Sequence, residues 1–187
     1  MLSRFTKIEI ALGCEKNIGY INIAKKIFAL YAADNCGRGA LVPARVTRIF
    51  RNITKEWLVL SSGLTVTPGH RFLNEHGTFE AIEALVARGG SIVTAEGELI
   101  AVTAERVVYS EATRHLYEEA EEIRYDSVGG LALAPRIERG WRTYNFEVEG
   151  LHTYIAGGIR VHNDSIEDFN DLAGLVTNGC DSTLCGL

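Results

Sequence analysis

The chain contains one segment whose residues could break a peptide bond of the chain itself. This segment, residues 143–163, is rich in β-branched and aromatic residues and ends on the dipeptide His162–Asn163. The side-chain amide nitrogen of an asparagine can attack the carbonyl carbon of the same residue, closing a succinimide ring and releasing whatever follows. A neighbouring histidine can carry the proton transfer that such a cleavage needs. The pattern predicts self-processing at Asn163–Asp164 rather than turnover of a separate substrate.

The composition of the chain changes at the same bond. Residues 164–187 contain no lysine or arginine, so their acidic side chains account for the whole formal net charge of −5. Acidic and basic residues balance in residues 1–163. A chain of 187 residues that is 47% hydrophobic suits one domain with a core and a tail. We expect a domain at residues 1–163 and an acidic flanking segment at residues 164–187.

Several classes of function are disfavoured by composition. The negative net charge argues against nucleic-acid binding, and no apolar run approaches the roughly 18 residues of a membrane span. Charges at Arg4, Lys7 and Glu9 interrupt the first residues, so we expect no signal peptide. We expect a monomer without nucleic-acid or membrane partners, and the compartment of the parent protein stays open.

The four cysteines do not indicate a metal or a cofactor. Cys14, Cys36, Cys180 and Cys185 form no CxxC pair and no cluster with zinc spacing. Free thiols and a Cys180–Cys185 pair in an oxidising compartment both remain open. No cysteine lies next to a paired histidine in the sequence, which disfavours a Cys–His hydrolase. We expect no cofactor, although the sequence leaves open whether zinc binds at the histidines.

Most of residues 1–163 is predicted to form short strands. β-Branched and aromatic runs alternate with Gly, Asn and Asp at intervals of about 8–12 residues, which is typical of a compact all-β fold. The predicted strands are residues 8–11, 27–31, 44–50, 57–61, 64–67, 91–94, 99–102, 105–109, 143–148 and 153–156. Residues 79–88 are predicted to be a helix, residues 115–123 a second helix or a charged loop, and residues 127–135 a loop. Residues 18–26 fit either a strand or a helical turn.

Two blocks of the sequence resemble those of intein and Hint domains. The terminal block comprises Tyr144-Asn-Phe-x-Val, His152-Thr-Tyr-Ile, a glycine pair and Val161-His162-Asn163. The second block, Thr67-Pro-Gly-His70, is similar to the internal Thr-x-x-His motif of that family. The resemblance implies an all-β horseshoe of short strands with pseudo-two-fold related halves, in which both ends of the domain meet at one site.

The N-terminal block resembles the family's first block but departs from it at the decisive position. Leu2, Thr6, Ile8, Ile10 and Gly13 match. Met1 stands where the family has a cysteine or serine nucleophile, and a thioether has no proton to lose and is a poor acyl acceptor. Arg4 lies near the usual glycine, and Ala24-Lys25 replaces a Gly-Asp pair in the next block.

The resemblance assigns a role to each matching residue. Asn163 would be the nucleophile, and His162 would polarise the scissile carbonyl or protonate the leaving amine. His152 would help to deprotonate or orient the Asn163 amide. Thr67 and His70 would line the same site as vestiges of N-terminal chemistry.

Full splicing is not expected at either end. It requires Cys, Ser or Thr directly after the terminal Asn, whereas this chain has Asp164. The chain is therefore more similar to bacterial intein-like and polymorphic-toxin processing domains, which act in cis on flanking segments of a host protein. Residues 103–140, where large inteins carry a homing endonuclease, are too short for one. We expect a single-turnover, self-cleaving domain; the alternative is an inactive or trapped Hint domain that serves as a non-catalytic scaffold.

Overall fold

The structure is a computed structural model of the 187-residue chain. It describes residues 1–4, 6–10, 14–20, 26–30, 39–125, 127–128, 131–132, 134–150 and 152–163. The predicted flanking segment, residues 164–187, lies outside these ranges, as do Ala24, Lys25 and Cys36.

The described residues form an all-β fold, as the sequence predicts. The first strands are β1 (Lys7–Ile10), β2 (Cys14–Asn17), β3 (Lys26–Leu30), β4 (Leu41–Thr54), β5 (Glu56–Leu60), β6 (Thr65–Val66), β7 (Arg71–Leu73), β8 (Phe79–Ala81) and β9 (Ser91–Val93). They are followed by β10 (Leu99–Ala101), β11 (Ala104–Val108), β12 (Glu119–Arg124), β13 (Ser127–Val128), β14 (Leu131–Ala132), β15 (Arg136–Val148), β16 (Thr153–Ala156) and β17 (Ile159–His162). The helices are the 3₁₀ turns η1 (Ile18–Tyr20) and η2 (Arg114–Leu116) and the six-residue α1 (Ile82–Ala87). Within the described ranges, therefore, no helix is long enough to span a membrane.

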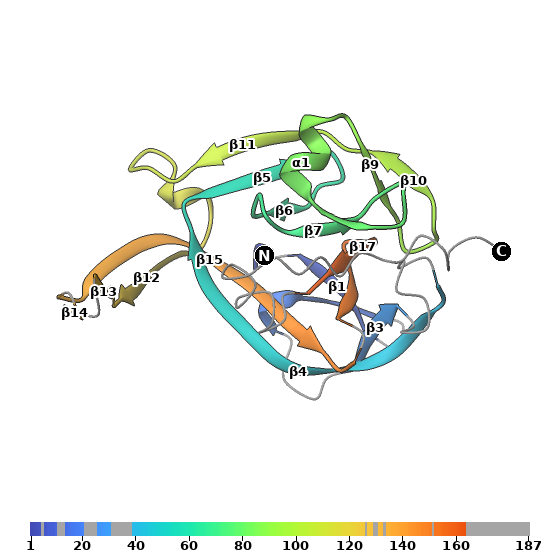
Figure 1. The fold of residues 1–187 in the computed structure, drawn as a ribbon, viewed down its shortest axis with the longest axis horizontal. Helices are drawn as coiled ribbons and strands as arrows, with labels where there is room; N and C mark the ends of the chain where they lie inside the picture. The colour runs from blue at the N-terminus through green and yellow to red at the C-terminus, as the bar shows by residue number, and fades with distance from the viewer. Residues whose placement is uncertain are drawn as a thin grey trace.

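Two long strands connect the parts of the molecule. β4 pairs with β3 through Leu41–Arg45 and then with β15 up to Thr54, and β15 pairs with both β4 and β12. Figure 1 shows β4 and β15 sweeping around the lower strands β1 and β3, whereas β5, β6, α1, β9, β10 and β11 lie above. Each of these two strands pairs with two neighbouring strands. This explains why β4 and β15 are longer than the predicted strands 44–50 and 143–148. The predicted pseudo-two-fold relation between the halves stays a prediction.

The first residues of the chain run through the core. Leu2 is fully buried and forms antiparallel bridges with Tyr144 of β15 and Val66 of β6. The Leu2 amide donates to the Tyr144 carbonyl at 2.9 Å, and the Tyr144 amide donates back at 2.9 Å. Figure 1 accordingly places the N-terminus near the centre of the molecule.

The prediction of a helix or charged loop over residues 115–123 is wrong. Residues Glu119–Arg124 form strand β12, which pairs with β15 and makes direct and diagonal ion pairs across the two strands. Glu121 faces Arg139 at 2.6 Å, and Arg124 contacts Glu138 at 3.2 Å. Cross-strand ion pairs of this kind stabilise a strand that has little apolar surface to bury. Charge spacing in a single segment does not reveal a partner strand elsewhere in the chain.

Three smaller predictions also need correction. Residues 127–135 do not form only a loop, because β13 and β14 pair as a short hairpin within them. Residues 79–88 begin as strand β8, and the helix is confined to Ile82–Ala87. The short strands β2, β7 and β17 were not predicted. Residues 18–26, whose sequence fits either a strand or a helical turn, begin with the 3₁₀ turn η1.

The glycine pair of the terminal block forms the turn between β16 and β17. Gly157 and Gly158 both have positive φ, 55° and 74°, between the paired residues Ala156 and Ile159. A two-residue turn with two positive φ angles matches the twist of a hairpin and fixes its register. A Cβ atom on Gly157 would lie 2.6 Å from Leu64 Cδ2, so a side chain at this position would also force Leu64 to shift.

Candidate active site

The end of strand β17 places Asn163 between two histidines. Thr153 pairs with His162 across β16 and β17, so the next residues in register are His152 and Asn163. The Asn163 amide indeed donates to the His152 carbonyl at 2.9 Å. On the other side of β17, Val161 pairs with Phe72 of β7. Continuing that register by two residues sets Asn163 opposite His70, and residues opposite each other on antiparallel strands share a face.

Asn163 is fully buried, and its side-chain amide has no hydrogen-bond partner among the described residues. Its main-chain amide is held by the hydrogen bond to His152, whereas its side chain makes no hydrogen bond to the described residues. A buried amide without partners costs about 1–3 kcal/mol of folding free energy. Such orphaned groups require an explanation, and catalysis is one of the recognised reasons for them.

His70 is the second buried polar group without a partner. Its side chain is 1% exposed, and neither ring nitrogen has a hydrogen-bond partner in the described part of the chain. Phe72 contacts the imidazole edge-on, with ring centroids 5.4 Å apart. Burial lowers the pKa of His70 well below its ordinary value, and positive charge at the Met1 amino group and at His162 lowers it further. His70 is therefore a neutral imidazole at neutral pH, able to accept a proton.

His152 adopts a left-handed backbone conformation, with φ 52°, which no other described non-glycine residue shares. Its Nδ1 is buried without a hydrogen-bond partner among the described residues. This region of backbone space is unfavourable for residues with a side chain and persists only where surrounding contacts enforce it. Here the bond from Asn163 and the pairing of β16 with β17 enforce it.

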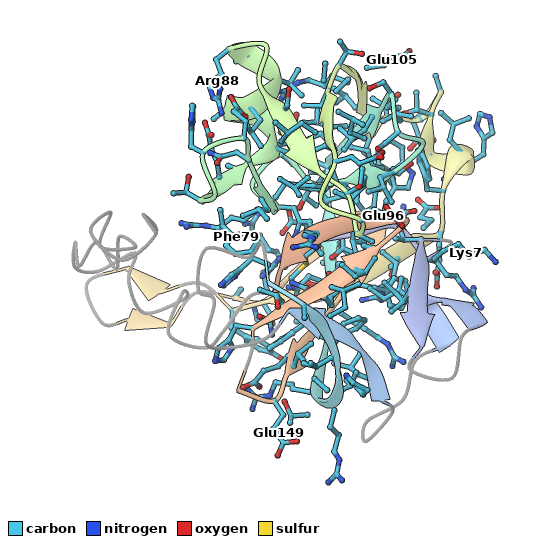
Figure 2. The ribbon with its side chains drawn as sticks, turned by 90° about the vertical axis from the view of Figure 1, so that its right-hand side faces the viewer. Lys7, Phe79, Arg88, Glu96, Glu105 and Glu149 are labelled. Carbon is cyan, nitrogen blue, oxygen red and sulfur yellow. The ribbon has the colours of Figure 1, made fainter. Side chains whose placement is uncertain are left out.

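His162 precedes Asn163 on β17 and belongs to the opposite face of the strand. Its ring packs against Phe79 of β8, with centroids 5.1 Å apart. His162 is half-buried, unlike Asn163 and His70. Figure 2 shows Phe79 below Arg88, at the level of the orange strands.

Thr67 holds the main chain of Met1. The Met1 nitrogen donates to Thr67 Oγ1 at 2.5 Å, and the Thr67 amide donates to the Met1 carbonyl at 2.8 Å. The turn that starts at Thr67 also carries His70, whose amide donates to the Thr67 carbonyl at 3.0 Å. One turn therefore contacts residue 1 and presents His70 to Asn163.

The Met1 sulfur accepts two hydrogen bonds. Thr143 Oγ1 donates to it at 2.8 Å, and Asn52 Nδ2 donates at 3.5 Å. Sequence reasoning assigned no role to Thr143, although it lies in the terminal block, and none to Asn52 or to Phe79. Asn52 lies in a strand without a motif, so its place beside residue 1 becomes visible only in the pairing of β4 with β15.

The chain has two further histidines and two tryptophans. His76 is 71% exposed and contacts Glu75, and His115 is exposed in η2. Trp57 and Trp141 are fully buried core residues. Asp164 lies outside the described residues, so its position relative to Asn163 is not described. Within the described ranges, no group of three His, Cys, Asp or Glu side chains is arranged to hold a metal ion.

Solved structures with this fold are known. The chain aligns with the bacterial intein-like domain from Clostridium thermocellum at 20% identity and a TM-score of 0.57, covering 87% of this chain and 97% of that domain. The chain has the Hint fold of inteins. A DnaB intein from Synechocystis matches at 18% identity, with a TM-score of 0.55 and 88% and 98% of the two chains covered. The gp41-1 intein matches at 18% identity, with a TM-score of 0.53 and 87% and 97% covered. No family model and no curated protein matches the sequence.

The Hint fold thus brings together a buried asparagine, two histidines that flank it across neighbouring strands, and a third histidine directly before it in the chain. An arrangement of this kind can bind and transfer protons around one peptide bond. Residue 1 lies at the other end of the same turn. In this chain, however, residue 1 offers a thioether rather than a thiol or a hydroxyl.

Proposed function

We propose that this Hint domain cuts its own chain at Asn163–Asp164 by cyclisation of Asn163. The single observation that carries the proposal is that the Asn163 amide and the His70 imidazole are both buried without hydrogen-bond partners among the described residues, directly beyond the ends of the paired strands β17 and β7. A neutral imidazole opposite a primary amide is a suitable proton acceptor for that amide.

The proposed step balances without water or a cofactor. Asn163 Nδ2 forms a bond to the Asn163 carbonyl carbon while the bond from that carbon to the Asp164 nitrogen breaks. One proton leaves Nδ2 and one proton reaches the Asp164 nitrogen, which departs as an amine. The products are residues 1–163 ending in a succinimide and residues 164–187. Each molecule reacts once.

We assign parts of the proton transfer to the three histidines according to the position of each. His70 and His152 flank Asn163 and would accept the proton from Nδ2 or orient the amide. His162 is half-buried and packs on Phe79, so it can exchange protons with solvent more readily than buried His70. We assign to His162 the donation of a proton to the leaving amine or polarisation of the carbonyl.

The N-terminal half of the site is not proposed to react in this chain. A thioether cannot lose a proton to become the nucleophile of an acyl shift. Thr67 and His70 therefore serve residue 1 only by holding and surrounding it. The domain would act in cis on the segments of the host protein that flank it, releasing the C-terminal one.

The test is a time course of intact mass on the purified chain. We expect a new species ending at Asn163 and lighter by one water than the product of hydrolysis at the same bond. Asn163→Ala should abolish it, and Asn170→Ala, a matched change beyond the cleaved bond, should leave it unchanged. A fragment that still forms in Asn163→Ala would contradict cyclisation.

A second candidate function is a trapped Hint domain that acts as a scaffold. The observation that favours it is the hydrogen-bonded Met1 sulfur at the position of the nucleophile. This reading predicts an intact chain after prolonged incubation with and without added thiol. The same mass measurement therefore decides between the two candidates.

A further inference from the structure

Two donors from neighbouring strands converge on the side chain of residue 1. Asn52 of β4 and Thr143 of β15 lie directly opposite each other in the sheet. Their side chains therefore share a face, and both donate to the Met1 sulfur, at 3.5 Å and 2.8 Å. Thr143 is 1% exposed, so its hydroxyl has little access to water as an alternative partner.

The main chain around Met1 is held independently of this pair. Thr67 bonds to the nitrogen and the carbonyl of Met1, and Leu2 bridges to Tyr144 and Val66. With the main chain fixed on both sides, the direction of the residue 1 side chain is also restricted. The Asn52–Thr143 pair lies where that side chain ends.

We propose that Asn52 and Thr143 form a seat for the side chain of residue 1, built to hold a sulfur or an oxygen with two hydrogen-bond donors. In this chain the seat holds a thioether. The two residues are positioning residues, because they act through residue 1. The seat concerns residue 1 alone and goes beyond the proposed cleavage at Asn163, on which it does not depend.

The chemistry of the seat favours an electron-rich sulfur. A thioether accepts hydrogen bonds weakly, whereas donors directed at a thiolate stabilise its charge and lower the pKa of the thiol. In a Met1→Cys chain with an upstream segment, the introduced thiolate would attack the preceding carbonyl carbon. A thioester forms, the peptide C–N bond breaks, and the nitrogen of residue 1 takes up a proton. Added thiol then releases the upstream segment by exchange.

The first test uses the full chain as it stands. The chain has a single methionine, so methyl-¹³C-methionine gives one methyl signal, which reports on residue 1 alone. Thr143→Val and Asn52→Leu should each move this signal toward the position of methionine in an unfolded chain. Thr143→Ser keeps the hydroxyl and should retain the original signal. Thr47→Val, a matched change elsewhere on β4, should also leave it unchanged.

The second test measures thiol-induced release of an upstream segment from the Met1→Cys chain. It is done in an Asn163→Ala background, so that failure of C-terminal cleavage does not affect it. Loss of one hydrogen bond to a charged group should slow release by about 10- to 100-fold in Thr143→Val, and Thr143→Ser should restore it. Circular dichroism melting confirms that each variant is folded.

The outcomes separate the seat from the proposed function. A Met1 methyl signal that is the same in Thr143→Val, Asn52→Leu and the parent chain overturns the seat. The methyl signal could instead move in Thr143→Val while thiol-induced release stays as fast in Met1→Cys with Thr143→Val as in Met1→Cys alone. That result overturns the role of the seat in presenting a nucleophile. Neither result depends on cleavage at Asn163–Asp164, which is measured in the parent chain.

Discussion

The buried imidazole of His70 should make the stability of this domain depend on pH in a defined direction. Burial lowers the pKa of His70 well below its ordinary 6.5, and the positive charges at the Met1 amino group and His162 add to the effect. In the unfolded chain the same imidazole takes up a proton below pH 6.5, whereas in the folded domain it does not. Protonation therefore favours the unfolded state, and stability falls as the pH falls below 6.5.

The size of the effect follows from proton linkage. Below the unfolded pKa, the unfolded state holds one more proton at this residue, so the free energy of unfolding drops by up to about 1.4 kcal/mol per pH unit. Between about pH 7.5 and about pH 5.5, the loss assigned to one such histidine is about 1.4 kcal/mol in total. Above pH 6.5 the contribution is fully present, and it declines until the pH reaches the folded pKa.

Urea unfolding of the wild type and of His70→Phe, followed by tryptophan fluorescence at these pH values, isolates the contribution. The other histidines are common to both chains, so the difference between the two slopes belongs to His70. We expect the wild type to lose about 1.4 kcal/mol more than the variant over this range. His70→Leu, which also cannot titrate, should behave like His70→Phe. Parallel pH dependences in all three chains would refute a neutral, buried His70.

Two further predictions concern the other histidines of the site. Phe79→Leu removes the aromatic face that packs on His162 and should slow cleavage at Asn163–Asp164, whereas Phe79→Tyr should preserve the rate. Mass spectrometry over time measures both, with melting temperature as the control for folding, and equal rates for the two variants would exclude a role for the ring. His152→Gly accommodates the φ of 52° at that position without a side chain. Its free energy of unfolding should stay within about 1 kcal/mol of wild type while cleavage slows at least about tenfold. A cleavage rate equal to wild type would show that the His152 side chain takes no part.

The sequence allows the all-β class and the positions of the apolar strands, such as β5, β11 and β16, to be predicted, because apolar and β-branched residues mark buried strands. It misses shorter strands such as β2 and β7. It does not allow the ends of β4 and β15 to be predicted. Both strands continue into surface regions where alternation weakens and where pairing with a second neighbour decides the boundary. The same holds for β12, whose pairing with β15 does not follow from its own apolar pattern.

The candidate site could be predicted in part. Thr67, His70, His152, His162 and Asn163 lie in motifs with defined spacing, and the structure gathers them around the end of β17. Their roles remain predictions. Asn52 and Phe79 could not be found from sequence, because each joins the site through a neighbouring strand rather than through a spacing along its own. A residue of this kind carries no local pattern, and only strand register brings it to the site.

The two ends of the site are built on different elements, so a change at one end need not disturb the other. Residue 1 is held by β15 and by the Asn52–Thr143 pair, whereas Asn163 is placed by the Gly157–Gly158 turn and by β7. A slip of one residue between β16 and β17 would turn Asn163 to the opposite face, but a change at Met1 leaves that register untouched. The two ends share the turn from Thr67 to His70, which contacts Met1 at its start and ends directly before β7, the partner strand of β17. This turn holds residue 1 through Thr67, and at its other end His70 lies directly before the strand that pairs with β17.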